Sequence, residues 1–221
     1  MINRELYMEQ ITPFIDKPFV KVITGIRRCG KSVVLRLIRE ELLRRGVSED
    51  YIIYMNFESF EWIDMKEAKA LYAHIREATK ASGKYYILLD EIQEVTDWEK
   101  AVNAFLVDLD VDIYVTGSNS RLLSSEFSTY LAGRYVAFHI MTLSFREYLL
   151  FHDLPLTISV SDRKTEFLKY LRMGGFPAIH TANYDYNAIY KIVYDIYSSV
   201  ILRDTVQRHS IRNVEMLERV V

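Results

Sequence analysis

The sequence has little of several features that would place a protein outside the ordinary cell interior. It contains one cysteine, Cys29, so a disulfide within the chain is excluded, and a lone thiol suits a reducing compartment. No apolar run approaches the roughly 18 residues of a membrane-spanning helix. The first ten residues, MINRELYMEQ, include acids and lack the apolar centre of a secretory signal. We therefore expect a cytoplasmic protein that does not associate with a membrane.

Excess charge of either sign is also lacking. The formal net charge is −2, which gives no general attraction to nucleic acid or to an anionic membrane. A local basic cluster has two interpretations, a nucleic-acid patch or the solvated outer face of a helix. The neighbouring acids Glu40 and Glu41 favour the second. The cluster consists of Arg27, Arg28, Lys31, Arg36, Arg39, Arg44 and Arg45. The five histidines lack metal-ligand spacing, so a structural zinc site is not expected.

What the sequence does contain is a series of short apolar runs that alternate with amphipathic segments. Runs that are apolar on both faces, separated by helices, are typical of a parallel sheet covered on both sides, and therefore of an α/β fold. The expected strands are 20–24, 51–57, 85–90, 112–118 and 135–143. The expected helices between them are 31–45, 65–81, 98–109 and 121–131.

The pattern changes after Ser144. A helical stretch follows, then a loop at 153–162, a helix at 165–173, a break at GGFP (174–177) and a long helix at 184–204. We predict an α/β core over 1–150 and a small helical lid over 151–205. The final residues start an amphipathic pattern that has no cap or breaker. We interpret 206–221 as the start of a further C-terminal domain, so that the chain is the front part of a longer protein.

The stretch GIRRCGKSVVL, Gly25 to Leu35, has the spacing of a phosphate-binding loop. Its backbone N–H groups and the following helix N-terminus can hold phosphate oxygens, with Lys31 reaching the β- and γ-phosphates and Ser32 ligating Mg²⁺. An ordinary strand–turn–helix is the alternative, but the position between a strand and a helix favours the loop. The expected nucleotide contacts are Gly25, Ile26, Arg27, Arg28, Cys29, Gly30, Lys31, Ser32 and Val33. Cys29 is interpreted as a small filler residue with no reactive role.

A second motif, YYILLDEIQ, places two acids at the end of an apolar strand. Asp90 can hold the water shell of Mg²⁺, and Glu91 can polarise the water that attacks the γ-phosphate. The alternative is that the pair only opens the next helix. Separate carboxylates for the metal and for the base indicate an ATPase and not a passive nucleotide binder.

Other polar residues near strand ends allow two interpretations each. Thr116, Ser118 or Asn119 can sense the γ-phosphate, or Ser118 or Ser120 can cap the next helix. Asn56 can hydrogen-bond Glu91 if their strands are neighbours, or it can belong to a turn. Arg134 can neutralise the γ-phosphate in the transition state, from the same chain or a neighbouring one, or it can form a surface ion pair. Arg121 is a lesser candidate for that role.

Taken in order, GIRRCGKS, LLDEIQ, TGSNSRLLSSE, LAGRY, LSFREYL and GGFP resemble the prokaryotic AAA+ ATP-binding proteins related to the archaeal ATPase and STAND families of P-loop NTPases. The resemblance runs from Arg4 to about Arg203. It implies an additional-strand AAA+ core with a parallel five-stranded sheet of order 5-1-4-3-2, a helical lid and a C-terminal domain of unknown function.

The resemblance also implies roles for single residues. Ser118 or Asn119 becomes the sensor, because strand 4 lies between strands 1 and 3, and Asn56 becomes a neighbour of Glu91. Arg134 becomes an arginine finger or sensor. Gly175 and Pro177 become the lid element that touches adenine, and Arg4 and Tyr7 become weaker candidates for the base pocket.

These observations predict Mg²⁺-dependent ATP binding and hydrolysis by a switch or motor module. The alternative is an ATP-dependent DNA- or protein-binding module with negligible turnover by itself. A small-molecule kinase is disfavoured because residues 145–180 do not form the basic lid such enzymes use. ATP is the expected ligand, with an unknown protein or DNA partner and a possible homo-oligomer.

Overall fold

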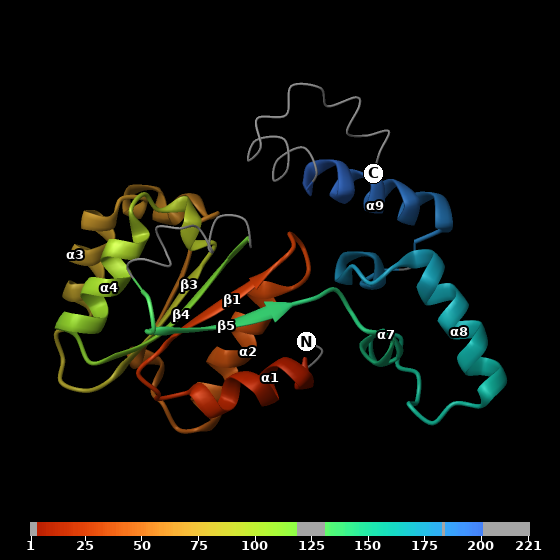
Figure 1. The fold of residues 1–221 in the computed structure, drawn as a ribbon, viewed down its shortest axis with the longest axis horizontal. Coiled ribbons are helices and arrows are strands. Elements are labelled where there is room, and N and C mark those ends of the chain that lie inside the picture. The colour runs from red at the N-terminus through yellow and green to blue at the C-terminus, as the bar shows by residue number, and fades with distance from the viewer. Residues whose placement is uncertain (1–3, 119–130, 183, 201–221) are drawn as a thin grey trace. The chain divides into compact units, whose positions relative to one another are not determined.

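A computed structural model describes residues 4–118, 131–182 and 184–200 (Figure 1). The chain forms two compact units. Among the described residues, one unit contains 4–25, 31–118 and 131–140, and the other contains 26–30, 141–182 and 184–200.

The first unit is built on a sheet of five strands in the order β2-β3-β4-β1-β5, all paired in parallel. Read from the other edge, this is the order 5-1-4-3-2, so the predicted α/β sheet is confirmed. The strands are β1 (Val20–Gly25), β2 (Ile52–Asn56), β3 (Tyr85–Asp90), β4 (Val111–Ser118) and β5 (Tyr135–Ile140). The carboxyl ends of parallel strands meet at one edge, where ligands bind in open α/β sheets.

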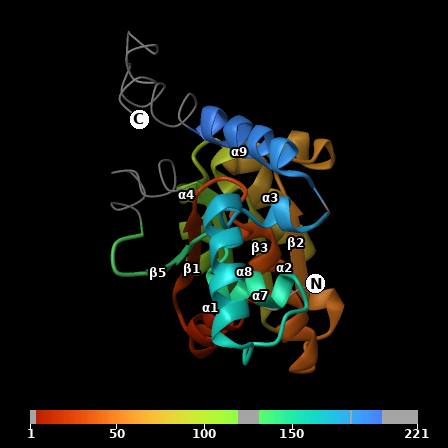
Figure 2. The same ribbon diagram turned by 90° about the vertical axis from the view of Figure 1, so that its right-hand side faces the viewer.

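Helices cover both faces of this sheet, with α3 and α4 on one face and α1 and α2 on the other (Figures 1 and 2). Their bounds are α1 (Glu5–Ile11), α2 (Lys31–Arg44), α3 (Ala68–Ala78) and α4 (Trp98–Asp108). Short 3₁₀ turns η1 (Thr12–Phe14), η2 (Glu49–Tyr51), η3 (Phe60–Met65) and η4 (Ile92–Glu94) lie between them. Coverage of both faces explains why most of the strand residues are apolar.

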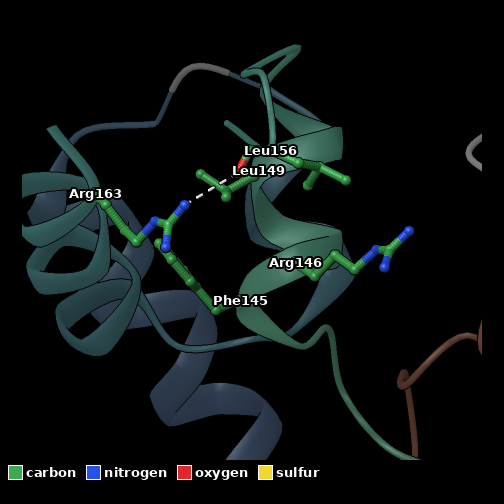
Figure 3. Close-up of a pocket in the computed structure, with 5 residues that line it drawn as sticks. All are labelled: Phe145, Arg146, Leu149, Leu156 and Arg163. Carbon is green, nitrogen blue, oxygen red and sulfur yellow. Dashed lines mark hydrogen bonds between the residues drawn. The ribbon is translucent and has the colours of Figure 1, made fainter. Parts of the chain in front are cut away.

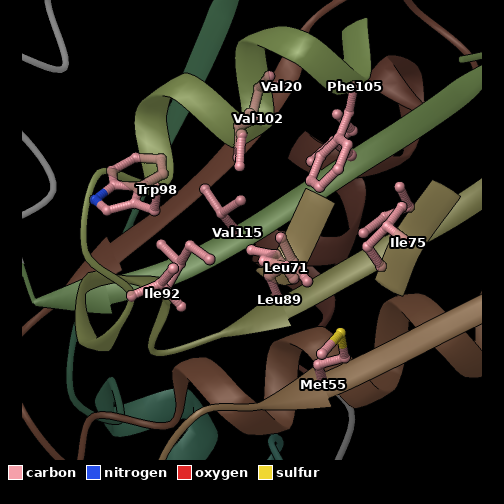
Figure 4. Close-up of a cluster of buried hydrophobic side chains, with 14 of the residues drawn as sticks. Val20, Met55, Leu71, Ile75, Leu89, Ile92, Trp98, Val102, Phe105 and Val115 are labelled. Carbon is pink, nitrogen blue, oxygen red and sulfur yellow. The ribbon is translucent and has the colours of Figure 1, made fainter. Parts of the chain in front are cut away.

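The main core lies between the sheet and helices α3 and α4. In Figure 4, Val102 and Phe105 of α4 face the sheet residues Val115 and Leu89. Phe105 is fully buried, which contributes about 1.5–3 kcal/mol to folding. Successive strand residues alternate between faces, so this packing directs residues 88, 90, 114 and 116 to the other face, where α2 lies.

A buried polar network lies near the amino ends of the strands. The Lys21 ammonium bonds Asp112 and donates to the Lys17 carbonyl at 2.9 Å. Asp112 also accepts from the Tyr114 hydroxyl at 2.8 Å and from the Asp16 N–H at 2.9 Å. Burial lowers the pKa of Lys21, and the Asp112 carboxylate opposes that shift. The network fixes the chain where it enters β1.

The second unit contains helices that follow the sheet in the chain. They are α7 (Phe145–Phe151), α8 (Val160–Met173), the 3₁₀ turn η5 (Pro177–His180) and α9 (Tyr186–Val200). Ser144 and Glu147 form a capping box at the start of α7. The rings of Phe145 and Tyr148 both lie within 6 Å of Tyr170 on α8, at centroid distances of 5.7 Å and 5.5 Å.

Some element bounds differ from the prediction. Helix α1 was not predicted, β5 ends at Ile140 and not at 143, and α8 begins at Val160 inside the predicted loop. The predicted helix 65–81 is the shorter α3, Ala68–Ala78, and the 3₁₀ turn η3 precedes the predicted range and meets it only at Met65. The predicted helix at 121–131 falls almost entirely outside the described residues. Among the described residues, no helix is long and apolar enough to cross a membrane.

Candidate functional site

The residues of the predicted phosphate loop connect β1 to α2. Gly25, Arg28 and Gly30 have positive φ values of 151°, 63° and 105°. Gly25 and Gly30 adopt such values without steric cost, whereas Arg28 needs the surrounding turn to hold it. The Cys29 N–H donates to the Ile26 carbonyl at 3.3 Å. Left-handed residues within a turn are the backbone arrangement that points N–H groups at an anion.

Lys31 is the first residue of α2 and is only 4% exposed. Its ammonium nitrogen donates to the Gly25 carbonyl at 3.4 Å and lies 3.5 Å from Glu91 Oε1. Ser32 follows in the first turn of the same helix and is half-buried. A buried cation at a helix N-terminus is a strong attractor for phosphate.

Asp90 is the last residue of β3 and is fully buried. Two hydroxyls hold its carboxylate: Thr116 Oγ1 donates to Oδ1 at 2.5 Å, and the Tyr54 hydroxyl donates to Oδ2 at 3.0 Å. Burial, reinforced by the Asp90 charge, raises the pKa of Tyr54, so this phenol remains a donor at neutral pH. Since a carboxylate can accept about four hydrogen bonds, Asp90 retains capacity for the water shell of a metal ion.

Glu91 lies directly after the strand and has a left-handed backbone, with φ 55° and ψ 48°. Its N–H donates to Thr116 Oγ1 at 2.9 Å, so a single hydroxyl serves both acids of the motif. A left-handed non-glycine residue costs about 1–3 kcal/mol and persists where the surroundings over-determine it. Here the strained residue is the predicted catalytic base.

Asn56 ends β2 and is the register partner of Asp90. Its side-chain Oδ1 accepts from the Glu58 N–H at 2.9 Å, which is the turn arrangement that the sequence also allowed. Its predicted bond to Glu91 remains a prediction.

Arg134 precedes β5, and its Nη1 donates to Asn103 Oδ1 on α4 at 3.1 Å. Its role as an arginine finger remains a prediction. Ser118 ends β4 and is the register partner of Gly25, which brings the end of β4 beside the end of β1. Asn119 and Arg121 lie outside the described residues.

The GGFP segment joins α8 to η5 in the second unit. A Cβ placed on Gly175 would meet the Leu143 carbonyl oxygen at 2.5 Å, and the Leu143 N–H donates to the Gly175 carbonyl at 2.7 Å. A close backbone approach therefore requires glycine at 175, and Pro177 starts η5. Contact with adenine remains a prediction for both residues, as it does for Arg4 and Tyr7, which stack at 4.7 Å from guanidinium carbon to ring centroid.

The basic cluster on α2 is largely engaged in local pairs. Arg44 and Arg45 both bond Glu41, at 2.7 Å and 2.8 Å, and Arg39 pairs with Glu49. These contacts are those of a solvated helix face.

A hollow of ≈ 270 Å³ lies in the second unit, lined by Phe145, Arg146, Leu149, Leu156 and Arg163. Figure 3 shows Arg146 directed away from Arg163, whose Nη2 donates to the Leu156 carbonyl at 3.2 Å. The two guanidinium groups do not converge on one point, so the hollow lacks the convergent polar groups of a ligand site.

The carboxyl edge of the sheet fits a nucleotide with its metal ion better than any other described part of the chain. It combines a buried ammonium group on Lys31, an oriented carboxylate on Asp90 and a glycine with positive φ, Gly25, at the end of β1. No group of three or more histidine, cysteine or acidic side chains within the described ranges forms a protein-only metal cage. A site with one carboxylate instead suits Mg²⁺, which keeps several waters and takes its other ligands from phosphates.

Two residues of this edge were not predicted from the sequence. The sequence contains only a weak indication of Tyr54. Once β2 and β3 are paired, Tyr54 lies opposite Leu88, and Leu88 lies on the same face of the sheet as Asp90. Gln93, in η4, donates to Glu91 and follows it by two positions. Only its short distance in sequence from the acid pair could have indicated that Gln93 contacts Glu91.

Comparison with known proteins agrees with this geometry. Residues 17–149 match the family model described as AAA domain, so the chain belongs to the AAA domain family of P-loop NTPases. An uncharacterized protein of Haemophilus influenzae is 39% identical over 222 residues, covering 100% of this chain and 54% of that protein. The uncharacterized protein MJ1544 of Methanocaldococcus jannaschii is 34% identical over 223 residues, covering 99% of this chain and 48% of that protein.

The chain thus spans about half the length of these curated relatives. Among solved structures, AMPPCP-bound DnaA from Aquifex aeolicus aligns with a TM-score of 0.53 at 15% identity, covering 100% of this chain and 69% of that one. That likeness concerns the fold. The family match establishes a nucleotide-binding class of protein.

Proposed function

We propose that this chain binds ATP with Mg²⁺ and hydrolyses it, as a switch or motor module for another component of the cell. The observation that carries the proposal is the ammonium nitrogen of Lys31 lying 3.5 Å from Glu91 Oε1, beside a fully buried Asp90. This geometry supports a site in which Lys31 serves as the cation for phosphate, Asp90 as the acid for the metal and Glu91 as the base. The bound AMPPCP of the similarly folded DnaA supports an adenine nucleotide as the ligand.

Each residue has a distinct part in this proposal. The loop backbone and Lys31 bind the β- and γ-phosphates, and a phosphate group competes with Glu91 for the ammonium. Asp90 and Ser32 hold the Mg²⁺, which neutralises phosphate charge when bound. Glu91 then accepts a proton from the attacking water. Its restricted backbone keeps the carboxylate next to the loop.

The remaining predicted residues complete the proposal. Arg134 stabilises the transition state as a finger or sensor, and Ser118 or Asn119 senses the γ-phosphate, with Asn56 near the base. Gly175 and Pro177 contact adenine. A protein or DNA partner and a homo-oligomer remain part of the proposal for the whole protein.

The experiment is a comparison of ATP turnover and ATP binding in matched variants. We expect Lys31→Ala to weaken ATP binding strongly, and Glu91→Gln to keep binding while turnover falls at least 100-fold. Lys80→Ala and Glu77→Gln are the controls, because this exposed ion pair is chemically the same and lies outside the site. Unchanged hydrolysis in both site variants would refute the assignment. Tight ATP binding by a wild-type chain without turnover would favour the binding-module alternative.

A further inference from the structure

Glu91 is held by two side chains, one on each carboxylate oxygen. Lys31 faces Oε1, and the side-chain amide nitrogen of Gln93 donates to Oε2 at 2.5 Å. The 3₁₀ turn η4 brings Gln93 back over Glu91, with the Glu94 N–H donating to the Glu91 carbonyl at 3.1 Å. The orientation of the Glu91 carboxylate is therefore fixed by one contact on each of its two oxygens.

The orientation of the Gln93 amide follows from this contact. An ionised carboxylate only accepts hydrogen bonds, so the NH₂ group must face Glu91 and the carbonyl oxygen must face away. That oxygen, Oε1, is buried and has no hydrogen-bond partner in the part of the chain that the structure describes. A buried acceptor without a donor costs about 1–3 kcal/mol of folding free energy. We therefore expect a donor to bind Gln93 Oε1 when the chain is active.

The missing donor is best supplied by a water molecule. The nitrogen and oxygen of the Gln93 amide are bonded to the same carbon, so a water bound to Oε1 would be held by the same side chain that contacts Glu91. A water is small enough for a site against buried atoms, and it carries the two O–H donors needed to reach both groups.

We propose that Gln93 is a positioning residue for hydrolysis, orienting Glu91 through Nε2 and the attacking water through Oε1. The inference rests on the proposed ATPase function and adds a residue to it. In the step, one water proton passes to Glu91, and the water oxygen forms a bond to the γ-phosphorus. The bond from that phosphorus to the bridging oxygen breaks, ADP keeps the electron pair, and Glu91 returns its proton to solvent.

The decisive variant is Gln93→Met, which keeps the side-chain length and removes both amide functions. We expect kcat to fall at least tenfold, while KM and the dissociation constant for ATP stay within threefold of wild type. Gln10→Met makes the same change on the exposed side of α1 and should leave all values unchanged. Unchanged kcat in Gln93→Met, or a loss explained by weaker ATP binding, would overturn the proposal.

A second measurement uses the nucleotide-free chain and does not depend on turnover. The Gln93 side-chain NH₂ proton signals, assigned by through-bond correlations to the Gln93 backbone, should move upfield in Glu91→Gln because the charged acceptor is gone. The Gln10 signals should stay in place. If the Gln93 signals were identical in wild type and Glu91→Gln, the hydrogen bond between Gln93 and Glu91 would be refuted. This outcome would stand even if Gln93→Met fails to fold. Absence of turnover in the wild type would instead refute the proposed function on which the role of Gln93 rests.

Discussion

The hydroxyl of Thr116 donates to Asp90 Oδ1 at 2.5 Å and accepts the N–H of Glu91 at 2.9 Å. One side chain on β4 therefore fixes two consecutive acids, Asp90 at the end of β3 and Glu91 directly after it. The relationship exists because β3 and β4 pair with Leu89 opposite Val115, which places the next residue of each strand together on the α2 face.

Thr116→Val should be costly for both stability and turnover. The change keeps the shape of the side chain but leaves the Glu91 N–H and a buried Asp90 carboxylate oxygen without their partner, at about 1–3 kcal/mol. We expect urea unfolding to show that loss and ATP hydrolysis to fall with it. Thr116→Ser retains the hydroxyl and should preserve most of both. Wild-type behaviour of Thr116→Val would contradict the bridging role.

Tyr54→Phe should weaken the dependence on the metal and leave folding almost intact. Loss of the phenol hydroxyl removes one of two donors that orient Asp90, so we expect the Mg²⁺ concentration for half-maximal turnover to rise several-fold. Tyr72→Phe is the matched control, because its hydroxyl donates to Asp108 at 2.7 Å at an exposed position. Equal shifts in both variants would argue against a role for Tyr54 at Asp90.

Lys21→Met should strongly destabilise the first unit. It leaves the Asp112 carboxylate buried without its cation, and breaking such a pair costs roughly 3–5 kcal/mol. Lys100→Met, in the exposed pair with Asp97, should change the free energy of unfolding by less than about 1 kcal/mol. Urea titrations of both variants measure the difference. A small effect of Lys21→Met would show that the cation is not needed to compensate the Asp112 charge.

The second unit should lose stability in mild acid through His180. Its Nε2 faces the Gly174 carbonyl at 2.8 Å and its Nδ1 lies 3.1 Å from His152 Nε2. Burial lowers the pKa of His180, while the bond to Gly174 opposes the shift. The unfolded chain then binds more protons than the folded one, so stability is full above about pH 6.5 and falls below it until the folded ring is protonated.

Hydrogen exchange of peptides from residues 141–182 measures this effect between pH 7.5 and 5. The groups that face the two rings include Tyr148, at centroid distances of 4.5 Å from His152 and 5.2 Å from His180, and Glu166, which accepts from the Tyr148 hydroxyl. We expect His180→Gln to flatten the pH dependence relative to wild type. His74→Gln, in the first unit, should leave it unchanged. A persistent slope in His180→Gln would assign the effect to another group.

Much of the fold was predictable because its signals are local. The strands are apolar runs, and the phosphate loop and the acid pair are contiguous motifs, so Lys31, Ser32, Asp90 and Glu91 could be singled out from spacing alone. The start of α8 was missed although Ser159 accepts from the Asp162 N–H, a cap that the sequence shows as serine followed by aspartate three residues later.

The rest of the site depends on register, which the sequence does not display. Thr116 was one of three residues that the sequence allowed as a phosphate sensor, and the pairing of β3 with β4 directs its hydroxyl to Asp90. Tyr54 reaches the same carboxylate only because Asn56 is paired with Asp90. Gln93 depends on the left-handed turn at Glu91, a conformation that sequence preference would assign to glycine or asparagine.

That left-handed turn has a consequence for engineering the chain. Design for stability alone would replace Glu91 with glycine, because glycine adopts a φ of 55° without strain. It would thereby improve the scaffold while erasing the proposed base, and stability would rise as activity vanished. Position 91 is thus where selection for a stable fold and selection for the proposed ATP hydrolysis favour different residues. Retention of glutamate there during directed evolution would itself report which of the two pressures dominates.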